Sequence, residues 1–224
     1  TPAVIYDNFL LRVPQFALQN QALTFSATPF PDNGQGVAAA VFPTGSFYVL
    51  AGIHDANAFI EESGFDTVGD GEYFKALELG WTPAFEKRKT DNVHVTVWHV
   101  DEVSGSGRPE GWGGTVSGQL YLCDRWLPFA RYSHAANDVL PIEHLIQGGL
   151  GVRLRDHDSV ALGVSYGTPS DGDLRSQWGA EIYYRLYVTQ ALSLIPGLQA
   201  FWNPSRNAET DQITVLSMRA RLSL

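Results

Sequence analysis

The chain has 224 residues, of which 44% are hydrophobic and only 17% are charged, and its formal net charge is −9. The acidic balance excludes a nucleic-acid binder, which would carry a basic patch or stripe. The single cysteine excludes an internal disulfide and a multi-cysteine metal site. No apolar run reaches the roughly 18 residues of a transmembrane helix, but membrane-spanning strands of about 10 alternating residues would escape that search.

Residues 1–35 form the first predicted unit. They show no alternation of apolar and polar residues, and they contain Pro14, Pro29, Pro31 and the pair Asn33-Gly34. We expect a long loop or irregular segment rather than a separate domain. Because residue 1 is Thr, we expect the chain to be a mature or truncated product.

Residues 36–224 predict the wall of an antiparallel β-barrel, as one domain. Apolar and polar residues alternate over short runs that are separated by turn residues, which favours all-β structure. About eleven strands are expected, near 36–43, 46–53, 72–81, 92–101, 114–123, 127–134, 146–154, 158–167, 176–188, 191–202 and 211–224.

The last predicted strand shows the alternation most clearly. Leu216, Met218 and Leu222 fall on one face, whereas Arg219 and Arg221 fall on the other, because successive side chains of a strand point to opposite sides. An apolar face opposite a charged face predicts a membrane barrel that directs apolar groups to lipid and polar groups to water.

The connections alternate between short turns and longer loops. This asymmetry is typical of outer-membrane up-and-down barrels, whose periplasmic turns are short. A complete bacterial barrel has an even number of strands, so an odd count means either that the count is wrong by one or that N-terminal strands of the same barrel are missing from this chain. We favour the second interpretation and expect missing strands.

Aromatic residues near strand ends predict contact with the membrane interface, where one side of the ring is apolar and the other wet. The alternative is that they are core aromatics of a soluble sheet. The predicted interface residues are Trp81, Trp126, Tyr132 and Trp202.

The last part of the chain, WGAEIYYRLYVTQALSLIPGLQAFWNPSRNAETDQITVLSMRARLSL, resembles the carbohydrate-selective porin family (OprB-like porins). Similar stretches in family order are PQFALQN, EYFKALELGW, GQLYLCDRWLPFARYS and GVRLRDHDSVALGVSYG. The resemblance implies a sixteen-stranded barrel in the outer membrane of a Gram-negative bacterium, through which glucose and other small sugars diffuse passively. It also implies that about five strands precede residue 1.

A passive sugar channel needs donors, acceptors and aromatic faces along a hydrated path. The predicted channel-lining residues are Glu78, Trp98, Tyr121, Arg131, Arg153, Glu181, Tyr183, Arg185, Arg219 and Arg221. The alternative for the arginines is a structural salt bridge in the wall, such as Arg185 with Glu181. The functional alternative is that some of the charges create a transverse electric field at the constriction of the pore. Arg131 and Arg153 are the candidates for that role.

No catalytic motif such as G-x-S-x-G or H-E-x-x-H occurs. Ser133 and His134 are adjacent, so they face opposite sides of a strand and cannot form a dyad. We therefore expect no enzyme activity, no cofactor and no metal site. The acidic loop 54–71 is expected to be solvated, with a calcium ion or a cation shared with lipopolysaccharide as the alternative.

The expected partners are small sugars, outer-membrane lipid and lipopolysaccharide, and the missing strands of the barrel, but not nucleic acid. Three other functions fit parts of the pattern. They are a soluble all-β carbohydrate-binding (lectin-like) module, a general diffusion porin without sugar preference, and a plugged barrel without flux.

Overall fold

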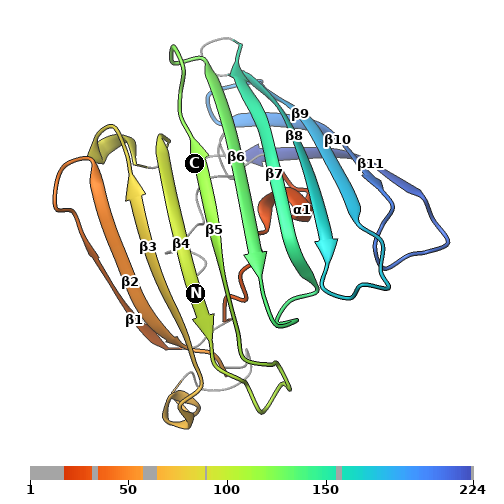
Figure 1. Ribbon diagram of the computed structural model, residues 1–224. Coiled ribbons are helices and arrows are strands. Elements are labelled where there is room, and N and C mark those ends of the chain that lie inside the picture. The colour runs from red at the N-terminus through yellow and green to blue at the C-terminus, as the bar shows by residue number, and fades with distance from the viewer. Residues whose placement is uncertain (1–17, 32–34, 58–64, 89, 155–157, 223–224) are drawn as a thin grey trace.

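The structure is a computed structural model that describes residues 18–31, 35–57, 65–88, 90–154 and 158–222. Its eleven strands form a single antiparallel sheet in which each strand pairs with the next in sequence, as Figure 1 shows. The strands are β1 (Gly36–Val41), β2 (Phe47–Asp55), β3 (Tyr73–Trp81), β4 (Asn92–Val100), β5 (Gly111–Gln119), β6 (Trp126–Ala135), β7 (Ile142–Arg153), β8 (Ser159–Pro169), β9 (Gln177–Tyr187), β10 (Leu192–Trp202) and β11 (Gln212–Leu222). The predicted all-β, up-and-down antiparallel architecture is confirmed.

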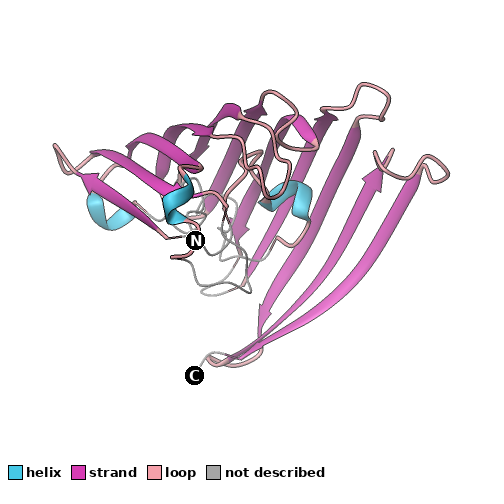
Figure 2. Ribbon diagram, turned by 90° about the horizontal axis from the view of Figure 1, so that it is seen from below, coloured by secondary structure: helices cyan, strands magenta, loops and turns pink. Residues whose placement is uncertain are grey.

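Within the described ranges, three short helices accompany the sheet: α1 (Gln21–Thr24), η3 (Val68–Asp70) and η4 (Phe85–Lys87). No helix in the described part of the chain is long and apolar enough to cross a bilayer. The sheet is curved, and α1 lies on its concave side (Figure 2). We call the concave side the inner face and the convex side the outer face.

In the central strands, polar residues are buried on the inner side while apolar residues are exposed on the outer side, which is unlike a sheet of a soluble protein. In β4 the inward His94 and Thr96 are buried, whereas the outward Val93, Val95 and Val97 are 39–50% exposed. A protein in water buries its apolar face. A continuous exposed apolar face across so many strands therefore needs an apolar solvent, which a bilayer supplies.

The two ends of the sheet differ. At one end, the short-turn end, the connections are residues 42–46, 82–91, 120–125, 154–158 and 188–191. At the other, the long-loop end, they are residues 56–72, 101–110, 136–141, 170–176 and 203–211. The tight turn of the β5–β6 hairpin places Cys123 and Asp124 at positive φ, as hairpin turns with two such residues require.

Outward aromatic residues mark both ends. Trp81 is the last residue of β3 and Trp126 the first of β6, at the short-turn end. Trp112, Trp178 and Trp202 lie within two residues of the long-loop ends of β5, β9 and β10. Two aromatic rows that flank an apolar band are typical of membrane barrels.

The predicted bounds of one strand, 114–123, were wrong by three to four residues, because β5 spans Gly111–Gln119. The cluster of Gly111, Gly113 and Gly114 resembles a loop in sequence but lies in the strand. A Cβ at Gly113 would collide with the Trp98 ring and the carbonyl oxygen of His134. Glycine is therefore needed there for close approach and not for a turn.

β1 and β11 are the edges of the sheet, and among the described residues each pairs with one strand only, β1 with β2 and β11 with β10. The prediction for residues 1–35 falls mostly outside the described residues. The described part of that unit, residues 18–31, contains α1 and lies against the inner face of β7, β8 and β9.

Candidate functional site

The inner face carries a polar network between β2 and β4. The hydroxyl of Tyr48 donates to Glu78 Oε1 at 2.8 Å, and the hydroxyl of Thr96 donates to Glu78 Oε2 at 2.7 Å. Glu78 is only 3% exposed. Both carboxylate oxygens are thus satisfied by neighbouring strands, and Glu78 joins three strands across the wall.

Arg131 extends this polar surface to β5 and β6. Its Nε donates to Ser117 Oγ at 2.9 Å, and the two residues lie opposite each other in register. Hydroxyl groups of Thr115 and Ser133, 3.4 Å apart, continue the row. The centre of the inner face is therefore lined by hydroxyl and guanidinium groups.

Residues 18–31 are fastened to this face by hydrogen bonds to their backbone. The N–H groups of Gln19 and Asn20 both donate to Glu181 Oε2, at 2.7 and 2.6 Å. The amide of Gln147 donates to the carbonyl oxygen of Phe25 at 2.7 Å. Leu23, which is fully buried, packs with Phe129, Ala161, Tyr183 and Ile195 on the inner face. We call residues 18–31 the inner segment.

Apolar contacts fix the same segment near the long-loop end. Ala27 belongs to a buried cluster with Phe74, Trp98 and Val100, and Phe30 packs against Phe74 with ring centroids 5.6 Å apart. Trp98 faces inward as predicted, but it is only 3% exposed. In this structure its ring contacts protein rather than an open path.

The second charged region lies on β9 and β11. Tyr183 interacts electrostatically with Arg185, Glu181, Arg219 and Tyr121. Glu181, Tyr183 and Arg185 are each 1% exposed. We call Glu181, Tyr183, Arg185 and Arg219 the arginine–tyrosine patch. It begins at Glu181, which binds the inner segment, and continues along β9 toward the short-turn end.

The predicted lining residues whose side chains are exposed or partly exposed on the inner face lie toward the short-turn end. Arg153 and Arg221 are exposed, and Tyr121 and Arg219 are partly exposed. The Arg153 guanidinium lies 5.1 Å from the centroid of the Tyr121 ring, and its Nη1 donates to the carbonyl oxygen of Asp124. A ring beside a guanidinium can contact both the apolar face and the hydroxyl groups of a sugar.

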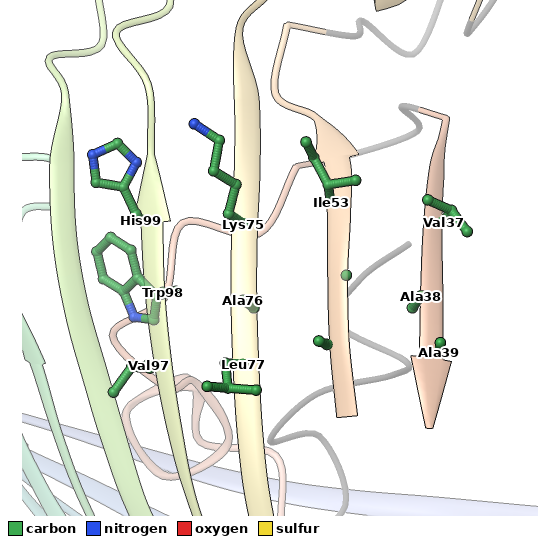
Figure 3. A pocket seen from close by; sticks show the side chains of 12 residues that line it. Val37, Ala38, Ala39, Ile53, Lys75, Ala76, Leu77, Val97, Trp98 and His99 are labelled. Atoms are coloured by element: carbon green, nitrogen blue, oxygen red, sulfur yellow. The ribbon is translucent and has the colours of Figure 1, made fainter. Parts of the chain in front are cut away.

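A groove lies on the outer face, between β1 and β4, and has a volume of about 570 Å³. Small side chains, such as Ala39 and Ala51, form its floor beside Val37, Leu77 and Val97. Figure 3 shows Lys75 and His99 at one end of the groove and Leu77 and Val97 at the other. Its apolar lining and outward position suit an acyl chain and not a hydrated sugar.

A charged cluster borders this groove at the long-loop end. Lys75 Nζ donates to Asp101 at 2.7 Å, and His99 lies 2.9 Å from Glu110. Burial alone would raise the pKa of Asp101. The hydrogen bonds from Lys75 and the Tyr73 N–H, together with the positive charge of Lys75 and the nearby His99 ring, hold that pKa below its ordinary value.

A family model described as "Carbohydrate-selective porin, OprB family" matches residues 111–224, just over half of the chain. The chain belongs to the OprB family of carbohydrate-selective porins. The family is one of bacterial outer-membrane β-barrel channels, and its members are normally channels rather than enzymes. Eight of the ten predicted lining residues lie within the matched region, and only Glu78 and Trp98 precede it.

A solved structure supports the same fold. The chain is similar to "High pH structure of Pseudomonas putida OprB", with a TM-score of 0.64 and 19% sequence identity. The alignment covers 84% of this chain but only 58% of the Pseudomonas putida chain. No curated protein matches the chain. The family match covers β5–β11, and the structural match supports the same fold over most of the chain.

The four predicted interface aromatics all lie on the outer face of this OprB-family wall. Trp126, Tyr132 and Trp202 are 40–43% exposed, and Trp81 is partly exposed. Sequence reasoning did not include Trp112 and Trp178 among them, although both are more than half exposed. Trp112 was missed because the strand was expected to begin at residue 114, three residues later than it does. Trp178 shares one side of β9 with Ala180 and Ile182, so the alternation in the sequence could have identified it.

The acidic loop 54–71 is only partly described, and Glu61 and Glu62 lie outside the described residues. Asp55 is buried, and its carboxylate accepts hydrogen bonds from the hydroxyl of Thr67 and the N–H of Asn57. These contacts give Asp55 a role in holding the loop. Asp70 accepts a hydrogen bond from the Asn57 amide.

Proposed function

We propose that this chain forms part of the wall of an outer-membrane pore through which small neutral sugars, such as glucose, diffuse passively in a Gram-negative bacterium. The observation that carries the proposal is the opposition of the two faces. Between the strand ends the outer face is mainly apolar, with polar residues such as Lys75, His134 and His144 toward the long-loop end, whereas the inner face presents hydroxyl, amide and guanidinium groups. Groups of this kind can replace the water around sugar hydroxyls.

In this proposal the inner segment contributes to the selection of solutes by narrowing the path through the barrel. It lies against β7, β8 and β9 on the inner side, so it occupies space that an open barrel would leave to water. A narrower path brings a solute closer to the wall. The proposed solute contacts are Tyr121, Arg153, Arg219 and Arg221, with Glu78, Arg131, Glu181, Tyr183 and Arg185 forming the supporting wall.

We also propose that further strands of the same protein close the barrel between β1 and β11. An open sheet edge leaves backbone N–H and C=O groups without partners, and this is costly in a bilayer. A family barrel of sixteen strands would need about five more. The outer face, including the groove beside Lys75, would then contact outer-membrane lipid and lipopolysaccharide.

Single-channel recording of the full-length protein in planar bilayers tests the solute. We expect glucose to reduce the ion current in a concentration-dependent and saturable way, because a bound sugar displaces ions from the narrow path. Sorbitol, a linear polyol of similar size without a pyranose ring, is the matched control and should block less. Equal effects of both solutes would indicate a general diffusion porin, and a protein without conductance would indicate a plugged barrel.

A further inference from the structure

The outer face holds a cluster of metal-ligating side chains that the sugar path does not use. His134 on β6 lies directly opposite His144 on β7, and Glu143 precedes His144. One potential ligand atom from each of the three residues lies within 4.8 Å of the others. Both histidines are on the outward side of their strands, close to the long-loop end.

A local irregularity of β7 brings Glu143 to this cluster. Adjacent residues in a regular strand point to opposite faces, so Glu143 and His144 would normally be separated. The register of β7 against β8 shifts between Ile142 and His144. The shift allows Glu143 Oε1 to approach His144 Nε2 to 3.5 Å on the same side of the sheet, in the manner of a bulge that redirects a side chain.

The distances suit a small ion. Zinc bonds to histidine nitrogen and carboxylate oxygen are about 2.0–2.2 Å long, so two ligands of a tetrahedral ion lie about 3.4 Å apart. The Glu143–His144 pair already has this spacing. The two imidazole rings are stacked with centroids 4.7 Å apart and an angle of 23° between their planes, so a small rotation of His134 brings its ligand atom into range.

The neighbours of the cluster orient the rings. The Tyr132 hydroxyl lies 2.9 Å from His144 Nδ1, which leaves Nε2 of that ring on the Glu143 side. Metal-bound histidines usually have such a partner on their second nitrogen. Nδ1 of His134 is shielded from solvent and has no hydrogen-bond partner among the described residues, so this polar atom is available for a ligand.

We propose that His134, Glu143 and His144 bind one divalent transition-metal ion, of which Zn²⁺ is the best match, on the outside of the wall. Two nitrogens and one carboxylate oxygen favour zinc, copper or nickel, whereas calcium and magnesium need sites made of oxygen ligands. The side chains of His144 and Glu143 are 42% and 45% exposed, so water can fill the remaining positions. The ion would join β6 to β7 at the base of the 136–141 loop.

Titration of the untagged full-length protein in detergent with ZnCl₂, followed by calorimetry, tests the site. We expect one high-affinity Zn²⁺ per chain. His144→Phe should weaken binding by about 100-fold or more, because it removes a ligand from a three-ligand site, and Tyr132→Phe should weaken it by about tenfold by releasing the His144 ring. His99→Gln, on the same face but outside the cluster, is the matched control and should leave the affinity unchanged.

A second readout uses Trp112, whose position relative to His134 is edge-to-face with centroids 5.5 Å apart. Cu²⁺ bound in the cluster should quench the fluorescence of a variant that retains Trp112 as its only tryptophan, and adding His144→Phe should remove this quenching. The conservative Tyr132→Phe keeps the test valid if His144→Phe does not fold. Absence of zinc binding by the wild-type protein, or unchanged affinity in both His144→Phe and Tyr132→Phe, would overturn the proposal.

Discussion

Replacing Ile182 by Arg should lower the free energy of unfolding in a bilayer by about 2–4 kcal/mol, the cost of a cation on the lipid face near the midplane. Ile182 lies at the middle of β9, points outward and is 44% exposed. It pairs with Leu162 on β8 and Leu198 on β10, which are also outward. An arginine there would meet only apolar side chains and lipid. Reversible unfolding of the full-length protein in lipid vesicles measures the change.

A shallow site provides the matched control. Leu222 is the last residue of β11 and lies beside Leu192 at the short-turn end. Because the cost of a cation falls to about 0–1 kcal/mol near the interface, Leu222→Arg should be tolerated much better than Ile182→Arg. Equal costs at the two depths would contradict the assignment of the outer face to lipid.

Replacing Glu181 by Ala should release the start of the inner segment and increase single-channel conductance. Glu181 accepts the N–H groups of Gln19 and Asn20 through one oxygen, and it is 1% exposed. A hydrogen bond to a charged group contributes about 1.5–3 kcal/mol. Losing both bonds therefore removes more stabilisation than a typical single contact of the inner segment provides, so the start of the segment should detach. Conductance of the full-length variant in planar bilayers measures the effect.

Two further variants separate this effect from general damage to the wall. Glu181→Gln keeps an acceptor oxygen but loses the charge, so its conductance should lie between those of the wild type and Glu181→Ala. Ser165→Ala also changes a buried inner-face residue, but its hydroxyl bonds to Gly179 on β9 and not to the inner segment. It should leave conductance unchanged. A Glu181→Ala channel with wild-type conductance would mean that the segment does not narrow the path.

The wall could be predicted from sequence because each strand carries its own pattern. The alternation of Leu216 and Met218 with Arg219 and Arg221 is fixed by the period of a strand, and no tertiary information is needed to interpret it. About eleven strands were expected, and the described residues contain eleven. The main error concerned β5, where glycines needed for close packing against Trp98 resembled the glycines of a loop.

The contacts across the wall could not be predicted in the same way. The attachment of Gln19 and Asn20 to Glu181 joins residues more than 160 positions apart, and nothing in either stretch specifies the other. The His134–His144 pair depends on the register of β6 with β7, and the contribution of Glu143 depends on a shift in that register. In the sequence no two histidines have the i, i+4 spacing of a metal-binding helix, and we therefore predicted no metal site.

The central claim is that the outer face contacts lipid and the inner face does not, and the six tryptophans test it directly. Trp178 points outward and is 51% exposed, whereas Trp98 points inward and is 3% exposed. Two full-length variants would each retain only one of these tryptophans, with the others changed to Phe, and be placed in vesicles of brominated phospholipid. Strong quenching of Trp178 with little quenching of Trp98 is the expected result. Equal quenching of both, or quenching of Trp98 alone, would contradict the account.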